Sequence, residues 1–254
     1  MKLFDLTGRV AIVTGGNGGI GQGMALGLGQ GGAKLAIVGR NAEKNAAAVA
    51  ALGELGADAI GLEADVTAEG DCQGLVERTL AHFGRVDILV NNAGINIRKQ
   101  PQDYTLAEWH AIVDGNLTSA FLCARAVYPA LLKAGGGKII NNASLSAILG
   151  IPFAAPYGAS KGGIVQLTRS LATAWAKDRI QVNAVLPGWV DTDLTRQARI
   201  DVPGLHDRVI SRTPAQRWGT PEDFAGIAVF LASSASDYVT GAAIPIDGGY
   251  AIQP

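Results

Sequence analysis

Short runs of apolar, mostly β-branched residues alternate along the chain with longer segments that favour helices. The runs are expected to be strands and cover residues 10–13, 34–38, 59–63, 86–90, 138–143, 180–186 and 242–246. They are apolar throughout, as in strands that helices cover on both faces. Because strands and helices alternate, right-handed crossovers within a parallel sheet are expected. The pattern predicts one doubly wound α/β domain of about seven strands over residues 1–254.

The intervening segments are expected to form helices over residues 20–30, 42–55, 68–84, 106–132, 157–178 and 221–231. Asn41, Thr67 and Thr105 are suited to cap three of them, because a side-chain oxygen there can accept a free backbone N–H. Pro221 is expected in the first turn of the last helix. Residues 190–214 are polar and weakly periodic, so they are expected to be a mobile substrate loop or short helices.

Composition narrows the function classes. Of the 254 residues, 48% are hydrophobic and 17% charged, which argues against disorder. The net charge of −1 gives no electrostatic reason to expect nucleic acid or an anionic membrane as a partner. No apolar run reaches the roughly 18 residues that span a bilayer. Cys72 and Cys123 lack the spacing of metal ligands, so we expect no metal site. Together these observations predict a soluble, cytoplasmic protein.

A glycine-rich loop, TGGNGGIG at residues 14–21, lies between the first expected strand and helix. Glycines there let backbone N–H groups approach a pyrophosphate, and the helix N-terminus adds partial positive charge. The loop therefore predicts dinucleotide binding. The spacing differs from G-x-G-x-x-G, so the loop alone indicates no subclass. The contacts expected from it are Gly15, Asn17, Gly19, Ile20 and Gly21.

The residue after the second strand bears on the choice between NADP(H) and NAD(H). An acidic residue there would bind a ribose 2′-hydroxyl and repel a 2′-phosphate. This chain has Arg40, which can pair with the phosphate and stack on adenine, or can be an ordinary surface charge. We expect NADP(H) to be preferred, with NAD(H) possible. Asp65 and Val66, after the third strand, can meet the adenine edge, although Asp65 is equally suited to capping the next helix.

Three side chains between residues 138 and 169 can converge on one reacting atom. Ser144 ends the fifth strand, Tyr157 follows thirteen residues later, and Lys161 lies one helical turn beyond it. Tyr157 is a candidate acid/base whose pKa, near 10 when free, would have to fall by about three units, or roughly 4 kcal/mol. Lys161 and an oxidised nicotinamide can supply that stabilisation, and Ser144 can bind the substrate oxygen. Ser146 is a rival for this role, at a spacing of eleven from Tyr157.

Asn116 lies inside the expected helix 106–132, where asparagine is a poor helix former. It can be an exposed, tolerated polar residue. Alternatively, a buried asparagine can free a backbone carbonyl to bind a water that links Lys161 to solvent. That arrangement would provide a proton relay.

Taken together, these motifs resemble the short-chain dehydrogenase/reductase family over essentially the whole chain. Besides the glycine loop, the resemblance rests on NNAG (91–94), GNL (115–117), YGASK (157–161), PGWVDT (187–192) and IDGG (246–249). It implies a Rossmann-type fold, hydride transfer between a nicotinamide and a secondary alcohol or ketone, and commonly a homotetramer. The implied catalytic tetrad is Asn116, Ser144, Tyr157 and Lys161. Further cofactor contacts are expected from Asn92, Ala93, Gly94, Pro187, Gly188, Val190 and Thr192, besides Tyr157 and Lys161.

Within the family, NNASLSA, APYGASK and SRTPAQRWGTPED look most like the gluconate 5-dehydrogenase and 2-deoxygluconate 3-dehydrogenase group, which acts on sugar acids and polyols. Arg98, Lys99 and Arg196 are candidates to bind a substrate carboxylate. In contrast, an apolar segment at Ile148, Leu149, Ile151, Pro152 and Phe153 suits a less polar ketone. The alternatives are therefore a reductase of less polar or acyl-thioester ketones, or a dinucleotide-binding sensor without catalysis.

Overall fold

Seven parallel strands form one sheet in the computed structural model, which describes residues 2–253. The strand order is β3-β2-β1-β4-β5-β6-β7, and each neighbouring pair is parallel. The strands are β1 Val10–Thr14, β2 Lys34–Gly39, β3 Ala59–Glu63, β4 Ile88–Asn91, β5 Gly137–Asn142, β6 Ile180–Pro187 and β7 Ala243–Ile246. This architecture confirms the doubly wound fold that the apolar runs predicted.

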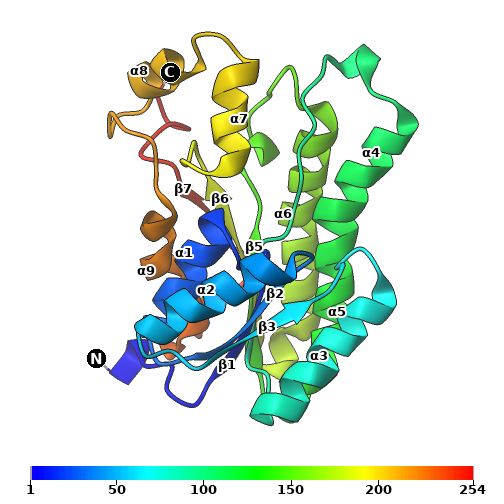
Figure 1. Ribbon diagram of the computed structural model, residues 1–254, viewed down its shortest axis with the longest axis vertical. Helices are drawn as coiled ribbons and strands as arrows, with labels where there is room; N and C mark the ends of the chain where they lie inside the picture. Colours follow the sequence, from blue (N-terminus) through cyan, green and yellow to red (C-terminus); the bar gives the residue numbers. More distant parts are fainter. Residues whose placement is uncertain (1, 254) are drawn as a thin grey trace.

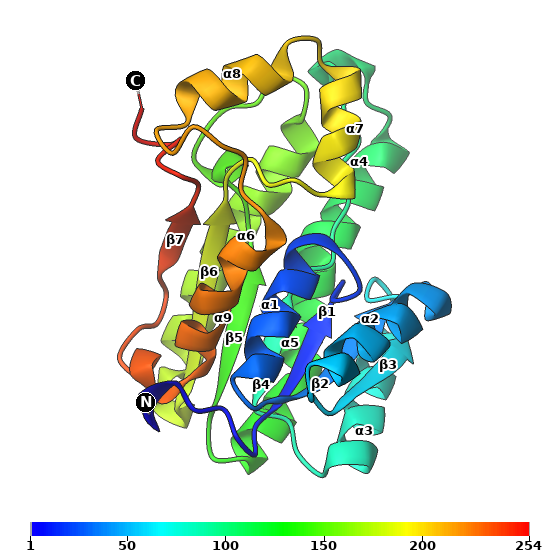
Figure 2. The same ribbon diagram turned by 60° about the vertical axis from the view of Figure 1, so that its left-hand side comes forward.

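Helices cover both faces of the sheet (Figure 1). The helices are α1 Gly19–Gln30, α2 Ala42–Glu54, α3 Glu69–Phe83, α4 Leu106–Val113, α5 Ser119–Lys133, α6 Ala155–Trp175, α7 Asp193–Asp201, α8 Leu205–Arg212 and α9 Ala225–Ala232. One layer contains α1, α2 and α9, and the other contains α3, α5 and α6. Figure 2 shows α7 and α8 above the carboxyl ends of the strands, where the site is built.

The strand side chains fill two cores, one on each face. On β1, Ala11 and Val13 pack toward α1 and α9, whereas Ile12 packs toward the opposite layer. On β2, Leu35 and Ile37 alternate with Ala36 and Val38 in the same way. Because both faces are buried, both sets of alternate positions in the middle of β1 and β2 are apolar. β5 and β6 also contain buried asparagines, Asn141 and Asn183, whose side-chain amides donate hydrogen bonds.

Two of the three predicted side-chain caps are confirmed. The Asn41 side chain accepts the N–H of Lys44, and Thr105 forms a reciprocal capping box with Glu108. The Thr67 prediction is wrong, because α3 begins at Glu69 and has no side-chain cap. Thr67 instead donates its N–H and its hydroxyl to the carboxylate of Asp65.

The predicted helix over residues 106–132 is divided in the structure. α4 ends at Val113, a π-helical turn covers Asp114–Thr118, and α5 begins at Ser119. α6 begins at Ala155, two residues earlier than predicted, since Pro156 fits the first turn of a helix. Likewise, the helix predicted from Pro221 begins as a 3₁₀ turn, Pro221–Phe224, before α9.

Residues 190–214, expected as a mobile loop or short helices, contain the short helices α7 and α8. These helices form a small apolar cluster of their own around Ala198, Leu205, Val209 and Trp218. Movement of this segment stays a prediction. Among residues 2–253, no helix is both long and apolar enough to cross a bilayer.

Candidate active site

The glycine loop is tied to the end of β4 by hydrogen bonds. The Thr14 hydroxyl accepts the backbone N–H groups of Asn92 and Ala93, at 3.0 and 3.1 Å. Asn92 also donates its side-chain amide to the carbonyls of Thr14 and Gly15. A Cβ on Gly21 would lie 2.3 Å from both Asn92 Nδ2 and the Gly15 carbonyl, so only glycine fits there. The loop thus has a fixed shape at the carboxyl end of the sheet.

Asn45 on α2 holds the other side of this loop and was not identified from the sequence. The buried Asn45 amide donates to the carbonyls of Gly39 and Leu62, at the ends of β2 and β3. Its oxygen accepts the Asn17 amide at 2.7 Å. The one signal was an asparagine inside the alanine-rich segment 42–55, where it is unfavourable in a helix. Asn45 therefore positions Asn17 and the tips of two strands.

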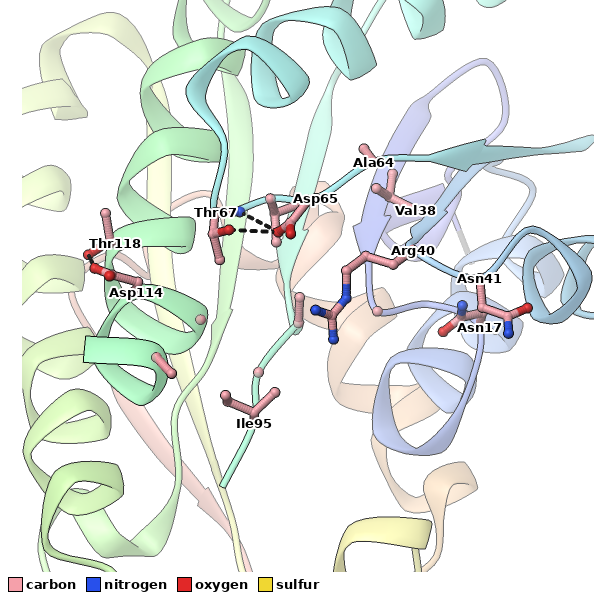
Figure 3. A pocket seen from close by; sticks show the side chains of 17 residues that line it. Asn17, Val38, Arg40, Asn41, Ala64, Asp65, Thr67, Ile95, Asp114 and Thr118 are labelled. Carbon is pink, nitrogen blue, oxygen red and sulfur yellow. Dashed lines mark hydrogen bonds between the residues drawn. The ribbon is translucent and has the colours of Figure 1, made fainter. Parts of the chain in front are cut away.

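Arg40 projects from the end of β2 into a cavity of about 860 Å³ (Figure 3). Asn17, Asp65 and Val66 line the same cavity. No described carboxylate forms an ion pair with Arg40. Hydrogen bonds from the Thr67 N–H and hydroxyl lower the pKa of Asp65, and the charge of Arg40 lowers it further. Asp65 thus lines the cavity and also holds the turn before α3.

A second cavity, of about 710 Å³, shares Gly15, Asn17 and residues 93–95 with the first. Of the residues predicted to contact the cofactor, Gly21 alone lines neither cavity; its role is in the shape of the loop. The predicted cofactor contacts that line the second cavity but not the first are Gly19, Ile20, Asn92, Tyr157, Lys161, Pro187, Gly188, Val190 and Thr192. Two connected cavities along the strand ends fit an extended dinucleotide, with its adenosine end at Arg40 and its nicotinamide end at Tyr157.

Lys161 is buried one turn along α6 from Tyr157. Its ammonium donates to the carbonyl of Asn142 at 2.6 Å and lies 5.6 Å from the centre of the Tyr157 ring. Burial lowers the pKa of Lys161 to about 8. The lysine therefore lies close enough to neutrality to exchange a proton within the physiological range.

Asn116 sits in the π-helical turn between α4 and α5, and its side chain is fully bonded. Its oxygen accepts the Ile95 N–H at 2.7 Å, and its amide donates to the Ile95 carbonyl and the Ser160 hydroxyl. A Cβ on Gly94 would lie 2.8 Å from Asn116 Oδ1 and 3.7 Å from Lys161 Nζ. The asparagine is therefore buried near the lysine and is not exposed. The water relay through its backbone carbonyl stays a prediction.

Tyr157 and Ser144 lie together in the wall of the second cavity. Burial raises the pKa of Tyr157, and the Ser144 hydroxyl and the charge of Arg98 offset this only in part. For the protein alone, this direction is the reverse of the predicted lowering, which included the charge of an oxidised nicotinamide. The rival Ser146 donates its backbone N–H to Ser144 Oγ and lies outside the second cavity. The geometry therefore favours Ser144 as the partner of Tyr157.

A third cavity, of about 120 Å³, adjoins Ser144 and Tyr157 on the side away from the glycine loop. Its apolar wall includes Leu149, Ile151 and Phe153, but not the exposed Ile148 or Pro152. This cavity is the candidate substrate site. Sequence reasoning missed several of its residues, among them Asn96, Trp189, Arg212 and Tyr250.

The three predicted carboxylate ligands have different positions. Arg98 lines the substrate cavity and donates to the Leu194 carbonyl. Lys99 forms an ion pair with Glu108 and is not in the cavity wall. Arg196 is exposed, pairs with Asp191 and Asp193, and lines the cofactor cavity.

Comparisons with known proteins agree with this geometry. A family model described as enoyl-(acyl carrier protein) reductase matches residues 15–251. The 2-dehydro-3-deoxy-D-gluconate 5-dehydrogenase of Dickeya dadantii is 42% identical over 98% of each chain. The chain belongs to the short-chain dehydrogenase/reductase family.

Solved structures of named dehydrogenases also have the same fold as this family member. A putative gluconate dehydrogenase from Agrobacterium tumefaciens has a TM-score of 0.94 at 44% identity, over 99% of each chain. A gluconate 5-dehydrogenase from Burkholderia cenocepacia, in complex with NADP and tartrate, has a TM-score of 0.93 at 39% identity, over 98% of this chain and 97% of that one. This short-chain dehydrogenase/reductase is therefore an NAD(P)-dependent oxidoreductase.

Proposed function

We propose that this enzyme interconverts a secondary hydroxyl and a ketone on a sugar acid, with NADP(H) as its preferred cofactor. The observation that carries the proposal is the substrate cavity beside Ser144 and Tyr157. Among residues 2–253, two arginines, Arg98 and Arg212, line it, and no aspartate or glutamate does. Such a wall attracts an anionic substrate. Two relatives, the 2-dehydro-3-deoxy-D-gluconate 5-dehydrogenase of Dickeya dadantii and the gluconate 5-dehydrogenase of Burkholderia cenocepacia, are named for sugar-acid substrates, which supports this proposal.

The chain's own residues account for the proton chemistry of that reaction. A bound nicotinamide would supply or accept the hydride. In ketone reduction, the Ser144 hydroxyl donates a hydrogen bond to the substrate oxygen and the Tyr157 phenol gives it a proton. Lys161, whose pKa burial lowers to about 8, then helps to restore that proton. Ketone, reduced cofactor and one proton become alcohol and oxidised cofactor.

The preference for NADP(H) rests on Arg40. Its side chain extends into the adenosine end of the cofactor cavity (Figure 3), and no acidic residue follows β2 to repel a 2′-phosphate. A guanidinium that is free of an ion pair can donate two parallel hydrogen bonds to the oxygens of a phosphate. The NADP in the Burkholderia cenocepacia enzyme supports the same choice.

A ketoreductase of less polar ketones is the second candidate. It is favoured by Leu149, Ile151 and Phe153, which form an apolar wall of the substrate cavity. An acyl-thioester substrate gains no support from the net charge of −1, since its carrier would call for a basic surface. A sensor without catalysis would not require a buried lysine beside Tyr157, because no proton has to be transferred. The position of Lys161 therefore favours an enzyme.

A substrate panel tests the proposal. D-gluconate, 5-keto-D-gluconate, uncharged polyols and aromatic ketones would each be assayed with both cofactors, by absorbance of the reduced nicotinamide. We expect the acids to have the highest kcat/KM. Higher values for aromatic ketones would favour the second candidate, and no turnover of any compound despite tight NADPH binding would favour a sensor.

Tyr157→Phe tests the chemistry in the same assay. General acid catalysis contributes about 10²- to 10⁴-fold, so kcat is expected to fall by at least this factor. NADPH binding, measured by fluorescence titration, should remain within about threefold, because the phenyl ring is kept. A variant that retains full activity would show that Tyr157 is not the acid.

We also propose that the enzyme is a cytoplasmic homotetramer. Large apolar side chains are exposed on α4 and α5, namely Leu106, Trp109, Phe121 and Leu132, and they suit contact with another copy. Light scattering coupled to gel filtration should then give four times the chain mass of 26.1 kDa. A monomer mass would contradict this assembly, and recovery in a membrane or periplasmic fraction would contradict the location.

A further inference from the structure

The substrate cavity contains buried polar atoms that the protein leaves without partners. Asn96 Oδ1, Ser146 Oγ and Arg212 Nε have no hydrogen-bond partner among residues 2–253, and all three side chains line this cavity. A buried polar group without a partner destabilises the fold, because it has lost its hydrogen bonds to water. Three in the wall of one small cavity indicate a ligand that is itself rich in hydrogen-bonding groups. An apolar ketone would leave all of them unpaired.

Arg212 differs from the other cations near the site. It lies at the end of α8, and its guanidinium rests 4.5 Å from the centre of the Tyr250 ring. The guanidinium forms no ion pair or hydrogen bond with any described residue. Stacking on an aromatic ring orients a guanidinium without using its N–H donors. Those donors are therefore available to a ligand.

The Arg98 guanidinium, in contrast, already contacts other residues of the protein. Its guanidinium donates to the Leu194 carbonyl on α7 at 3.0 Å and lies 3.5 Å from the Asp201 carboxylate at the other end of that helix. Both partners belong to the segment above the strand ends. Arg98 thus connects the loop after β4 to α7, and its charge is partly neutralised.

We propose that Arg212 is the residue that binds the substrate carboxylate, while Asn96 and Ser146 bind substrate hydroxyls. This inference rests on the proposed function and deepens it. Arg212 supplies charge-assisted hydrogen bonds to a carboxylate, Asn96 Oδ1 accepts a hydroxyl hydrogen, and Ser146 bonds to a second hydroxyl. Arg98 is a positioning residue that holds α7 over the site. The cavity then selects hydroxylated acids over polyols and apolar ketones.

A binding experiment that does not require turnover tests this assignment. D-gluconate and D-glucitol differ at one end, where gluconate has a carboxylate. Each would be titrated into the protein saturated with NADPH, by calorimetry, since neither alcohol is oxidised by the reduced cofactor. Arg212→Met should weaken gluconate binding about 10- to 100-fold, the range for hydrogen bonds to a charged group. Glucitol binding should change by less than about threefold.

Three further variants complete the design. Arg208→Met, on the same helix but outside the cavity, is the matched control and should bind gluconate like the wild type. Arg212→Lys keeps the charge and should retain part of the affinity, whereas Asn96→Ala should weaken gluconate and glucitol together. Thermal melting and NADPH binding show which variants are folded. If Arg212→Met does not fold, Arg212→Lys and Asn96→Ala decide the outcome.

The outcomes separate the inference from the proposed function. Equal gluconate affinity in Arg212→Met and wild type would overturn the role of Arg212. Gluconate that binds through Arg212 but is never turned over, in either direction and with either cofactor, would support the site and contradict the proposed reaction. Wild-type protein that binds glucitol as tightly as gluconate would overturn the carboxylate site itself.

Discussion

A single buried ammonium, that of Lys161, shows how the site depends on its surroundings. Its hydrogen bond to the Asn142 carbonyl does not fully offset burial, so the pKa falls to about 8. An unfolded lysine titrates near 10.4. Between these two pH values Lys161 binds more protons in the unfolded chain than in the folded one. Its contribution therefore makes the free energy of unfolding rise with pH. The raised pKa of Tyr157 acts in the opposite direction, but only above about 10.

The charge of Lys161 therefore gives a stability test. Urea unfolding of wild type and Lys161→Met would be compared at pH 8 and pH 10. The wild type should gain about 2 kcal/mol relative to the variant over this interval, because the buried lysine loses its unfavourable charge. All other titrating groups are shared and cancel in the difference. Identical pH dependence in the two proteins would mean that Lys161 titrates normally.

At the other end of the cofactor cavity, Arg40→Asp tests recognition of the 2′-phosphate. The change removes a cation and adds an acceptor for ribose hydroxyls, so KM for NADPH should rise about 10- to 100-fold while KM for NADH falls. Steady-state kinetics with both cofactors measure the shift. Undiminished kcat with NADH is the control for an intact site. Wild-type preference for NADH would refute the argument from Arg40.

Among the elements, the interrupted helix between α4 and α5 has the largest effect on the site. The π-helical turn widens the helix at Asn116, and the Ser119 N–H reaches back to the Asp114 carbonyl. The Ser119 hydroxyl in turn satisfies the Gly115 carbonyl at 2.8 Å. This local change lets the Asn116 side chain point toward Ile95 and Ser160. Such turns are frequent at functional sites.

Packing of α3 against α5 brings the two cysteines together. Cys72 and Cys123 are buried, with their sulfur atoms 3.6 Å apart, and both are free thiols. Burial rather than acidity controls their reactivity, because a reagent cannot reach them in the folded protein. Their environment is the core between helix and sheet.

In a thiol titration, Cys72 and Cys123 should therefore react with the reagent only after the protein is unfolded. The native protein is expected to react with less than about 0.1 equivalent of a bulky aromatic disulfide, and the urea-unfolded protein with both thiols. Absorbance of the released thiolate measures this. Rapid labelling of two thiols in native buffer would show that α3 and α5 separate readily.

Over the whole molecule, the first α-helix, α1, packs very closely against the last, α9, and against the turn before it. A Cβ on Gly23 of α1 would lie 1.8 Å from the carbonyl oxygen of Pro221, just before α9. Contact between α1 and α9 forms one core that connects the two ends of the sequence. The glycines of α1 lower its helix propensity but permit this approach.

Gly23→Ala is expected to destabilise the protein by about 1–3 kcal/mol or more, since steric overlap outweighs the gain of up to about 1 kcal/mol in helix propensity. Gly53→Ala on α2 is the matched control. Nothing lies within 4 Å of a Cβ there, so this change should be neutral or stabilising. Urea unfolding compares both with wild type, and equal effects would mean that the α1–α9 contact is loose.

The sequence alone determined the strands, two caps and the glycine loop, because each depends on a local pattern. The four candidate catalytic residues followed from their spacing together with the resemblance to the family, and their roles stay a prediction. Tertiary structure decided the rest. Asn45, Arg212 and Tyr250 join the site through contacts between segments far apart in the chain, and no local pattern encodes such contacts. The direction of the Tyr157 pKa likewise depends on burial, which only the folded chain sets.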